Sequence, residues 1–179
     1  MTGTSVPCYG YRAGPCIVAG SARCLHDDLE RAWKVYPDAS VIAVNGASRE
    51  VDAFMLVSQH PENFVNARWI ARQRKRQERF TVHSTSRAPG VDYVWDLPHR
   101  GGSAWLARRI AGTIGLSPVI LCGVPMEPGP YTSGSNIGGY MHRPDVVDEL
   151  FGQIERDVEW HAGVVSMSGR TMKLLDNAY

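Results

Sequence analysis

The segment that decides the fold is GGSAWLARRIAGTIGLSPVILCGVP, residues 101–125. Apolar side chains recur through its first half at helical spacing, and Arg108 and Arg109 fall on the opposite face. Gly115 follows at a position where glycine commonly caps the end of a helix. Residues 118–122 then form a short apolar run, which is typical of a strand covered on both faces. The segment therefore predicts a helix followed by a buried strand, and we expect the glycines at its two ends where the backbone contacts a ligand.

The same alternation of strands and helices extends along the chain. Apolar runs predict strands at residues 15–19, 41–44, 53–57, 80–83, 93–95, 118–122 and 164–166. Amphipathic spacing predicts helices over about 25–36, 62–77, 103–114 and 144–158, and a short one at the C-terminus. This order is typical of a mostly parallel, doubly wound sheet with helices on both faces. We therefore expect a single Rossmann-like α/β domain over residues 15–179, preceded by an N-terminal arm or loop over residues 1–14.

Length and composition limit the classes of protein that the chain can belong to. A chain of 179 residues suits one domain with a substantial core. A formal charge of +1 argues against a protein built mainly to coat nucleic acid. No apolar run approaches the roughly 20 residues of a membrane span, and the N-terminus lacks a signal pattern, so we expect a cytoplasmic location. None of the four cysteines forms a C-x-x-C pair, so no structural zinc site is expected.

Small and polar residues follow the predicted strands where those strands end. They are Gly20-Ser21, Asn45-Gly46, Ser58-Gln59-His60, Gly123-Val124-Pro125 and Ser166-Met167-Ser168. Open parallel sheets bind ligands beyond the carboxyl ends of their strands, and Ser103 opens a helix whose free N–H groups could hold an anion. Tight turns and helix caps use the same residue types, so each site alone also has a purely structural interpretation. Five such sites on one edge predict a nucleotide or phosphate crevice. The chain has neither a Walker motif nor G-x-G-x-x-G after the first strand, which argues against a dinucleotide-dependent dehydrogenase.

The ordered motifs also resemble a known family. The pattern CIVAGSA…VIAVNGASREVDAFMLVSQHP…GGSAWLARRIAGTIGLSPVILCGVP resembles glycosyltransferase family 42, the bacterial sialyltransferases that take sugar from a CMP donor. It also resembles a related group of domains that includes the archaeal 6-hydroxymethylpterin diphosphokinase. The resemblance covers roughly residues 15–175. It implies a GT-A-type fold and a CMP-type nucleotide-activated donor as co-substrate, without a bound cofactor or metal.

The resemblance and the sheet edge together give a set of candidate donor-binding residues. The resemblance places Gly20, Ser21, Asn45 and Ser103 against the donor. The predicted sheet edge adds Gly46, Gly102, Gly123 and Ser166. Tyr131 and Tyr140, in a loop rich in Gly and Tyr, could stabilise the departing phosphate together with helix N-termini.

Two histidines are candidates for the general base. The segment YMHRPDVVDELFGQIE, residues 140–155, resembles the sialyltransferase stretch in which a histidine just before a helix is the general base, and His142 has that position. The start of the following helix and Arg143 both disfavour the imidazolium, so we expect a neutral ring that can accept a proton. His60, after the third strand, is the second candidate.

Several interpretations stay open at this point. The leading one is a metal-independent glycosyltransferase that moves sugar from a nucleotide-activated donor to a hydroxyl acceptor. One alternative is a diphosphokinase acting on a small hydroxymethylated heterocycle; it would need Mg²⁺, for which Asp52 and Glu127 are candidate ligands. Another is a nucleotide-binding module without catalysis. The basic run Arg72–Arg79 is either a solvated helix end or a docking surface for nucleic acid, with a modified base as acceptor. The oligomeric state is also open, a homo-oligomer included.

Overall fold

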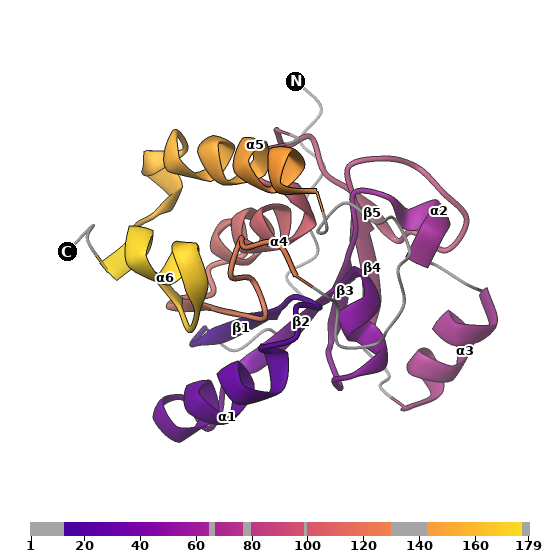
Figure 1. Cartoon of the computed structure of the whole chain (residues 1–179). Helices are drawn as coiled ribbons and strands as arrows, with labels where there is room; N and C mark the ends of the chain where they lie inside the picture. Colours follow the sequence, from indigo (N-terminus) through magenta and orange to yellow (C-terminus); the bar gives the residue numbers. More distant parts are fainter. Residues whose placement is uncertain (1–12, 65–66, 77–79, 99, 130–142, 177–179) are drawn as a thin grey trace.

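The computed structural model describes residues 13–64, 67–76, 80–98, 100–129 and 143–176. Its strands form one parallel sheet in the order β5-β4-β3-β2-β1-β6-β7 (Figure 1). The strands are β1 (Cys16–Ala19), β2 (Ser40–Val44), β3 (Met55–Val57), β4 (Thr81–Ser84), β5 (Tyr93–Val94), β6 (Val119–Cys122) and β7 (Val164–Ser166). The α-helices are α1 (Leu25–Val35), α2 (Pro61–Phe64), α3 (Ala67–Arg76), α4 (Gly102–Thr113), α5 (Pro144–Glu155) and α6 (Gly169–Asp176). Two short 3₁₀ helices, η1 (Asn45–Arg49) and η3 (Val158–Trp160), complete the description.

Helices cover both faces of the sheet, because successive strand residues point to opposite sides. Val18 and Leu121 belong to a large buried cluster under α4, α5 and α6. Ile17 and Ile120, one residue away in each strand, pack instead against α1. A smaller cluster on the α1 side holds α3 through Ile70. The predicted doubly wound α/β fold is therefore confirmed, with helices above and below the sheet in Figure 1.

The predicted strands appear close to their expected positions. Each forms where a short apolar run can be buried on both faces, as in β1 and β6, which are buried along their whole length. Gly115 has φ +83°, which confirms the expected left-handed residue after α4. The helix expected over residues 62–77 is described as α2 and α3 on either side of residues 65–66, which lie outside the described part of the chain.

The chain changes direction across the sheet at β1. β1 pairs with β2 on one side and with β6 on the other, both in parallel. Strands β2 to β5 extend the sheet one way, and β6 and β7 extend it the other way. The connections that leave β1 and β6 therefore diverge onto opposite faces at this point. In open α/β sheets such a switch point opens a crevice at the carboxyl ends of the strands.

The two arginines of α4 are not on the exposed helix face that their spacing predicted. Arg108 and Arg109 are buried, although their helical positions predicted an exposed face. Arg109 forms a buried ion pair with Asp157 and donates to the carbonyl oxygen of Pro98 at 2.7 Å. Arg108 donates to the carbonyl oxygen of Ala162 at 2.8 Å. The reason is that chain segments on both sides of α4 enclose the face of the helix that does not touch the sheet.

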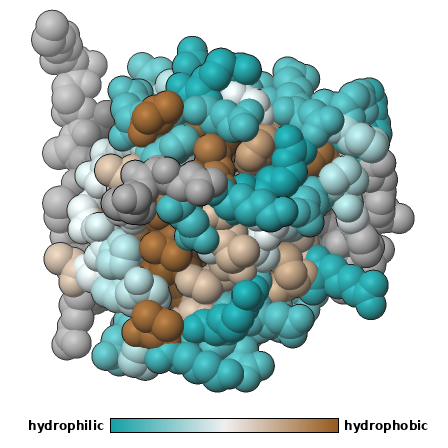
Figure 2. Space-filling view, turned by 60° about the vertical axis from the view of Figure 1, so that its left-hand side comes forward, coloured by the Kyte–Doolittle hydropathy of each residue, from teal (hydrophilic) through white to brown (hydrophobic). Residues whose placement is uncertain are grey.

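Hydrophilic and hydrophobic residues are both visible on the face of the molecule shown in Figure 2. In the face shown in Figure 2, teal residues surround a central band of hydrophobic ones. Of the exposed large apolar side chains among the described residues, Trp33 and Val35 lie on α1, Val94 on β5 and Val158 on η3. Within the described residues, no helix is both long enough and apolar enough to cross a membrane.

Candidate functional site

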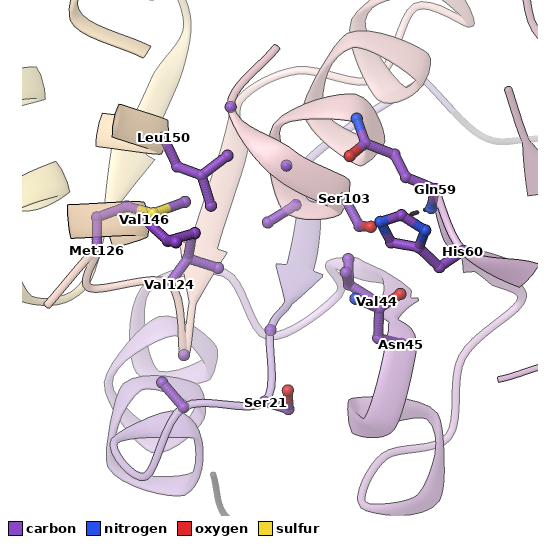
Figure 3. A pocket seen from close by; sticks show the side chains of 16 residues that line it. Ser21, Val44, Asn45, Gln59, His60, Ser103, Val124, Met126, Val146 and Leu150 are labelled. Carbon is purple, nitrogen blue, oxygen red and sulfur yellow. Dashed lines mark hydrogen bonds between the residues drawn. The ribbon is translucent and has the colours of Figure 1, made fainter. Parts of the chain in front are cut away.

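A cavity of about 310 Å³ lies at the carboxyl ends of β1, β2, β3 and β6, at the switch point (Figure 3). The start of α4 and the first turns of α5 border it. Its size is at the lower end of the range for small-molecule sites. The lining residues are Gly20, Ser21, Ala22, Val44, Asn45, Gln59, His60, Gly101, Gly102, Ser103, Ala104, Gly123, Val124, Met126, Val146 and Leu150.

Gly20 and Gly123 bring the ends of β1 and β6 together beneath this cavity. The Gly20 N–H donates to the carbonyl oxygen of Cys122 at 2.7 Å. A Cβ on Gly20 would lie 2.4 Å from the Gly123 oxygen, and a Cβ on Gly123 would lie 2.6 Å from the Gly20 oxygen. Gly123 also has φ +67°. Each glycine is therefore required by the backbone of the other, which is a packing reason for residues that we expected at a ligand.

A buried carboxylate holds the end of β6 in place. Asp28 on α1 is fully buried, and its Oδ2 accepts the Gly123 N–H at 2.8 Å and the Ser168 hydroxyl at 2.6 Å. Its Oδ1 accepts from Arg31 at 2.5 Å. Asp28 is not among the candidate residues predicted from the sequence. The available signal was its position between Leu25 and Leu29, which places a carboxylate on the apolar face of the helix.

The start of α4 presents backbone N–H groups to the cavity. The first N–H groups of a helix have no partner within it and carry a partial positive charge. Gly102 has φ +73°, and a Cβ there would have only Leu150 nearby, at 3.8 Å. Ser103 Oγ accepts the Gln59 N–H at 3.0 Å, which joins the helix start to the end of β3. The Gly101 N–H donates to Gln153 Oε1 of α5 at 2.8 Å. The helix start is thus fixed from two sides.

The cavity has one polar side and one apolar side (Figure 3). The apolar side chains are Val124, Met126, Val146 and Leu150, and the polar ones facing them across the cavity are Asn45, Gln59, His60 and Ser103. Asn45 begins η1 with φ +50°, and its Oδ1 is buried without a hydrogen-bond partner among the described residues. A buried amide oxygen without a partner is costly, and this one belongs to a side chain that lines the cavity.

The charges around the cavity restrict the ligand. No Lys, Arg, Asp or Glu lines it within the described part of the chain. Among the described lining residues, His60 is the one with a titratable side chain; it is mostly exposed, and its Nδ1 lies 3.6 Å from Glu62 Oε1. Asp52 and Glu127 are exposed and do not line the cavity. Nor do the described residues contain any group of three or more His, Cys, Asp or Glu that could hold a metal ion.

The structure brings together most of the predicted donor-binding residues that it describes. Those lining the cavity are Gly20, Ser21, Asn45, Gly102, Ser103 and Gly123, and His60, the second candidate for the general base, lines it too. Gly46 is instead buried within η1. Ser166 is buried because it shares a sheet face with Val164, and its hydroxyl lies 2.8 Å from Thr171 Oγ1 of α6. Tyr131, Tyr140 and His142 lie outside the described residues.

The apolar side of the cavity was not predictable from the sequence. Val146 and Leu150 lie four residues apart near the start of α5, on the apolar face that the amphipathic spacing of residues 144–158 predicts. Both are only partly buried and line the cavity. Helical spacing identifies such a face but does not show which of its positions border a cavity.

Comparison with known proteins does not assign the chain to a family. No family model, curated protein or solved structure matches the chain. The resemblance to glycosyltransferase family 42 therefore depends on the motifs of the sequence alone, and any function must be argued from the cavity.

Proposed function

We propose that the protein is a metal-independent transferase that uses a nucleotide-activated donor, and specifically a glycosyltransferase with a CMP-type donor. The observation that carries this proposal is the cavity at the β1–β6 switch point. There the start of α4 and the amide side chain of Asn45 lie across from an apolar wall. This combination suits a ligand with one apolar or ring-shaped face and one anionic group.

The two sides of the cavity would bind different parts of such a donor. The apolar side, with Val146 and Leu150, suits the face of a base or sugar ring. The N–H groups at the start of α4 suit a phosphate, because a helix N-terminus attracts anions without a cationic side chain. Ser103 Oγ accepts from Gln59, so its own O–H can still donate to that phosphate. A single phosphate fits this arrangement better than a polyphosphate, which usually needs Lys, Arg or Mg²⁺.

The transfer would be a direct displacement. The acceptor oxygen bonds to the anomeric carbon of the sugar, and the bond from that carbon to the phosphate oxygen breaks. The leaving phosphate takes the electron pair, and the start of α4 stabilises its charge. The acceptor proton passes to an imidazole nitrogen. His142 is the base that the sequence predicts, and His60 is the described histidine in position for the same role.

The alternative of diphosphate transfer has less support. That reaction requires Mg²⁺ held by carboxylates. Neither Asp52 nor Glu127 lines the cavity, and both are exposed. A nucleotide-binding module without catalysis uses the same cavity and differs only in turnover.

The test is to incubate the protein with a panel of nucleotide sugars and candidate acceptors in EDTA, and to measure release of the nucleotide. We expect release of a nucleoside monophosphate from a CMP-linked sugar. His142→Gln or His60→Gln, whichever residue is the base, should lower turnover by about 100-fold or more with donor affinity nearly unchanged. The control is His26→Gln, an exposed histidine on α1.

Three outcomes would contradict the proposal. Consumption of Mg²⁺-ATP alone would favour the diphosphokinase. Nucleotide binding without turnover on any donor would favour the module without catalysis. Turnover that persists in both histidine variants would remove them as the base.

A further inference from the structure

Helix α3 carries an exposed basic face. Its sequence, ARWIARQRKR, has five basic residues and no acidic one. Arg68, Arg72 and Lys75 are exposed, and helical spacing places them on one side of the helix. We call these three residues the α3 basic stripe. The opposite side of the helix buries Ile70 in the small cluster beneath it.

Positive charge is concentrated in this part of the chain. Residues 67–79 contain six basic side chains and one acidic one, a formal charge of +5. The whole chain has a formal charge of +1, so the remaining residues together carry −4. Asp92 pairs with Arg74, which is not one of the three stripe residues. Such segregation produces a local positive potential that attracts a polyanion even though the protein is almost neutral overall.

The stripe starts near the cavity side of the sheet. His60 lines the cavity, α2 follows it directly, and α3 comes next (Figure 1). In a crossover between parallel strands such as β3 and β4, the helix runs back from the carboxyl ends of the strands. Arg68 is therefore the stripe residue on the cavity side. From Arg68 to Lys75 the helix rises about 10 Å, at about 1.5 Å per residue. That length matches about three nucleotides at roughly 3.4 Å each along one strand.

A line of cations at this spacing fits a phosphodiester backbone better than a membrane surface. Helices that lie on membranes expose an apolar face beside their basic one. Among the described side chains, none of the exposed large apolar ones belongs to α3. We propose that the α3 basic stripe docks the backbone of a nucleic-acid strand, so that the acceptor hydroxyl of the transfer belongs to a nucleic acid. The docking stands on the stripe itself, and only the role of acceptor rests on the proposed function.

The test compares two triple variants of equal net charge. The stripe variant is Arg68→Gln, Arg72→Gln, Lys75→Gln; the control is Lys34→Gln, Arg49→Gln, Arg156→Gln, which are also exposed. Binding to a fluorescent oligonucleotide, single-stranded and duplex, is measured by anisotropy over a range of salt concentrations. We expect the wild type and the control to bind with a steep salt dependence. Each lost phosphate contact reduces the slope of log binding constant against log salt concentration by about 0.7 to 0.9. The slope should therefore be smaller by about 2 to 3 in the stripe variant, and its affinity about tenfold or more lower.

Three results would overturn the docking proposal: no binding of either oligonucleotide by the wild type, equal losses in the two variants, or stripe-dependent binding to acidic vesicles without binding to nucleic acid. Melting temperatures of both variants check the fold. Thermal stabilisation by CMP is measured on the same samples and should be the same in the stripe variant as in the wild type. If CMP stabilises the protein while oligonucleotides do not bind, the docking proposal fails alone. If oligonucleotides bind through the stripe but no nucleotide occupies the cavity, the proposed function fails and with it the role of nucleic acid as acceptor.

Discussion

Replacement of Asn45 by glycine separates ligand binding from local folding. Asn45 has φ +50°, a left-handed conformation that costs an alanine about 1 kcal/mol or more, whereas glycine adopts it freely. Asn45→Gly therefore removes the amide without imposing strain. The Oδ1 atom is buried and has no partner among the described residues, so the free protein loses no hydrogen bond from that atom. We expect the free energy of unfolding without ligand to change by less than about 1 kcal/mol.

The same substitution should weaken nucleotide binding. One hydrogen bond to the ligand contributes about 1 to 1.5 kcal/mol, which corresponds to a roughly 5- to 13-fold increase in Kd for CMP. The assay is isothermal titration in EDTA. Ser48→Ala is the matched control, because it removes the bond from Ser48 Oγ to the Asn45 carbonyl oxygen at 2.8 Å and leaves the amide in place. An unchanged Kd in Asn45→Gly, or an equal increase in Ser48→Ala, would refute the assignment of the Asn45 amide to the ligand.

Two further predictions concern stability. Asp157→Ala leaves the buried Arg109 guanidinium without its carboxylate and should cost about 3–5 kcal/mol in chemical denaturation, whereas Asp145→Ala, in an exposed pair, should change stability little; equal effects would contradict a buried ion pair. Burial lowers the pKa of His83 from 6.5 to about 4, so the unfolded chain binds a proton that the folded chain rejects. The free energy of unfolding is therefore unaffected by the protonation of this group above about pH 6.5. It falls by about 3 kcal/mol as the pH is lowered from there to 4. His83→Gln should therefore destabilise the protein less at pH 4 than at pH 7, and a pH-independent difference between wild type and variant would contradict this.

The fold follows from local sequence signals more directly than the cavity does. A continuous apolar run such as residues 119–122 is removed from water only when both faces of the strand are buried. Gly115 adopts the positive φ expected after a helix. Each of these local patterns spans only a few residues, and the structure observed there is the one that the pattern predicts. The order of strands in the sheet requires the contacts between distant segments, yet the alternation of elements already predicts the doubly wound class.

Pairings between distant residues could not be predicted in the same way. Arg109 meets a carboxylate 48 residues away in Asp157, and Asp28 accepts from Gly123, 95 residues away. A charged residue on one helix face predicts exposure unless the partner that buries it is known. Gly20 and Gly123 illustrate the same point, because the backbone of each explains the other. The polar residues around the cavity were predictable because they end strands on one edge. The apolar wall was not, since α5 supplies it from a separate part of the chain.

The central claim is that the cavity at the β1–β6 switch point binds a nucleoside monophosphate without a metal ion. The most direct test is the thermal stability of the protein with CMP in EDTA, compared between Leu150→Trp, which fills the apolar side of the cavity, and Val158→Trp, which adds the same ring at an exposed position. At 100 times the dissociation constant, CMP should stabilise the wild type and Val158→Trp by about 2.7 kcal/mol and Leu150→Trp by much less. Absence of stabilisation by any nucleotide in the wild type, or equal stabilisation of Leu150→Trp, would contradict the claim.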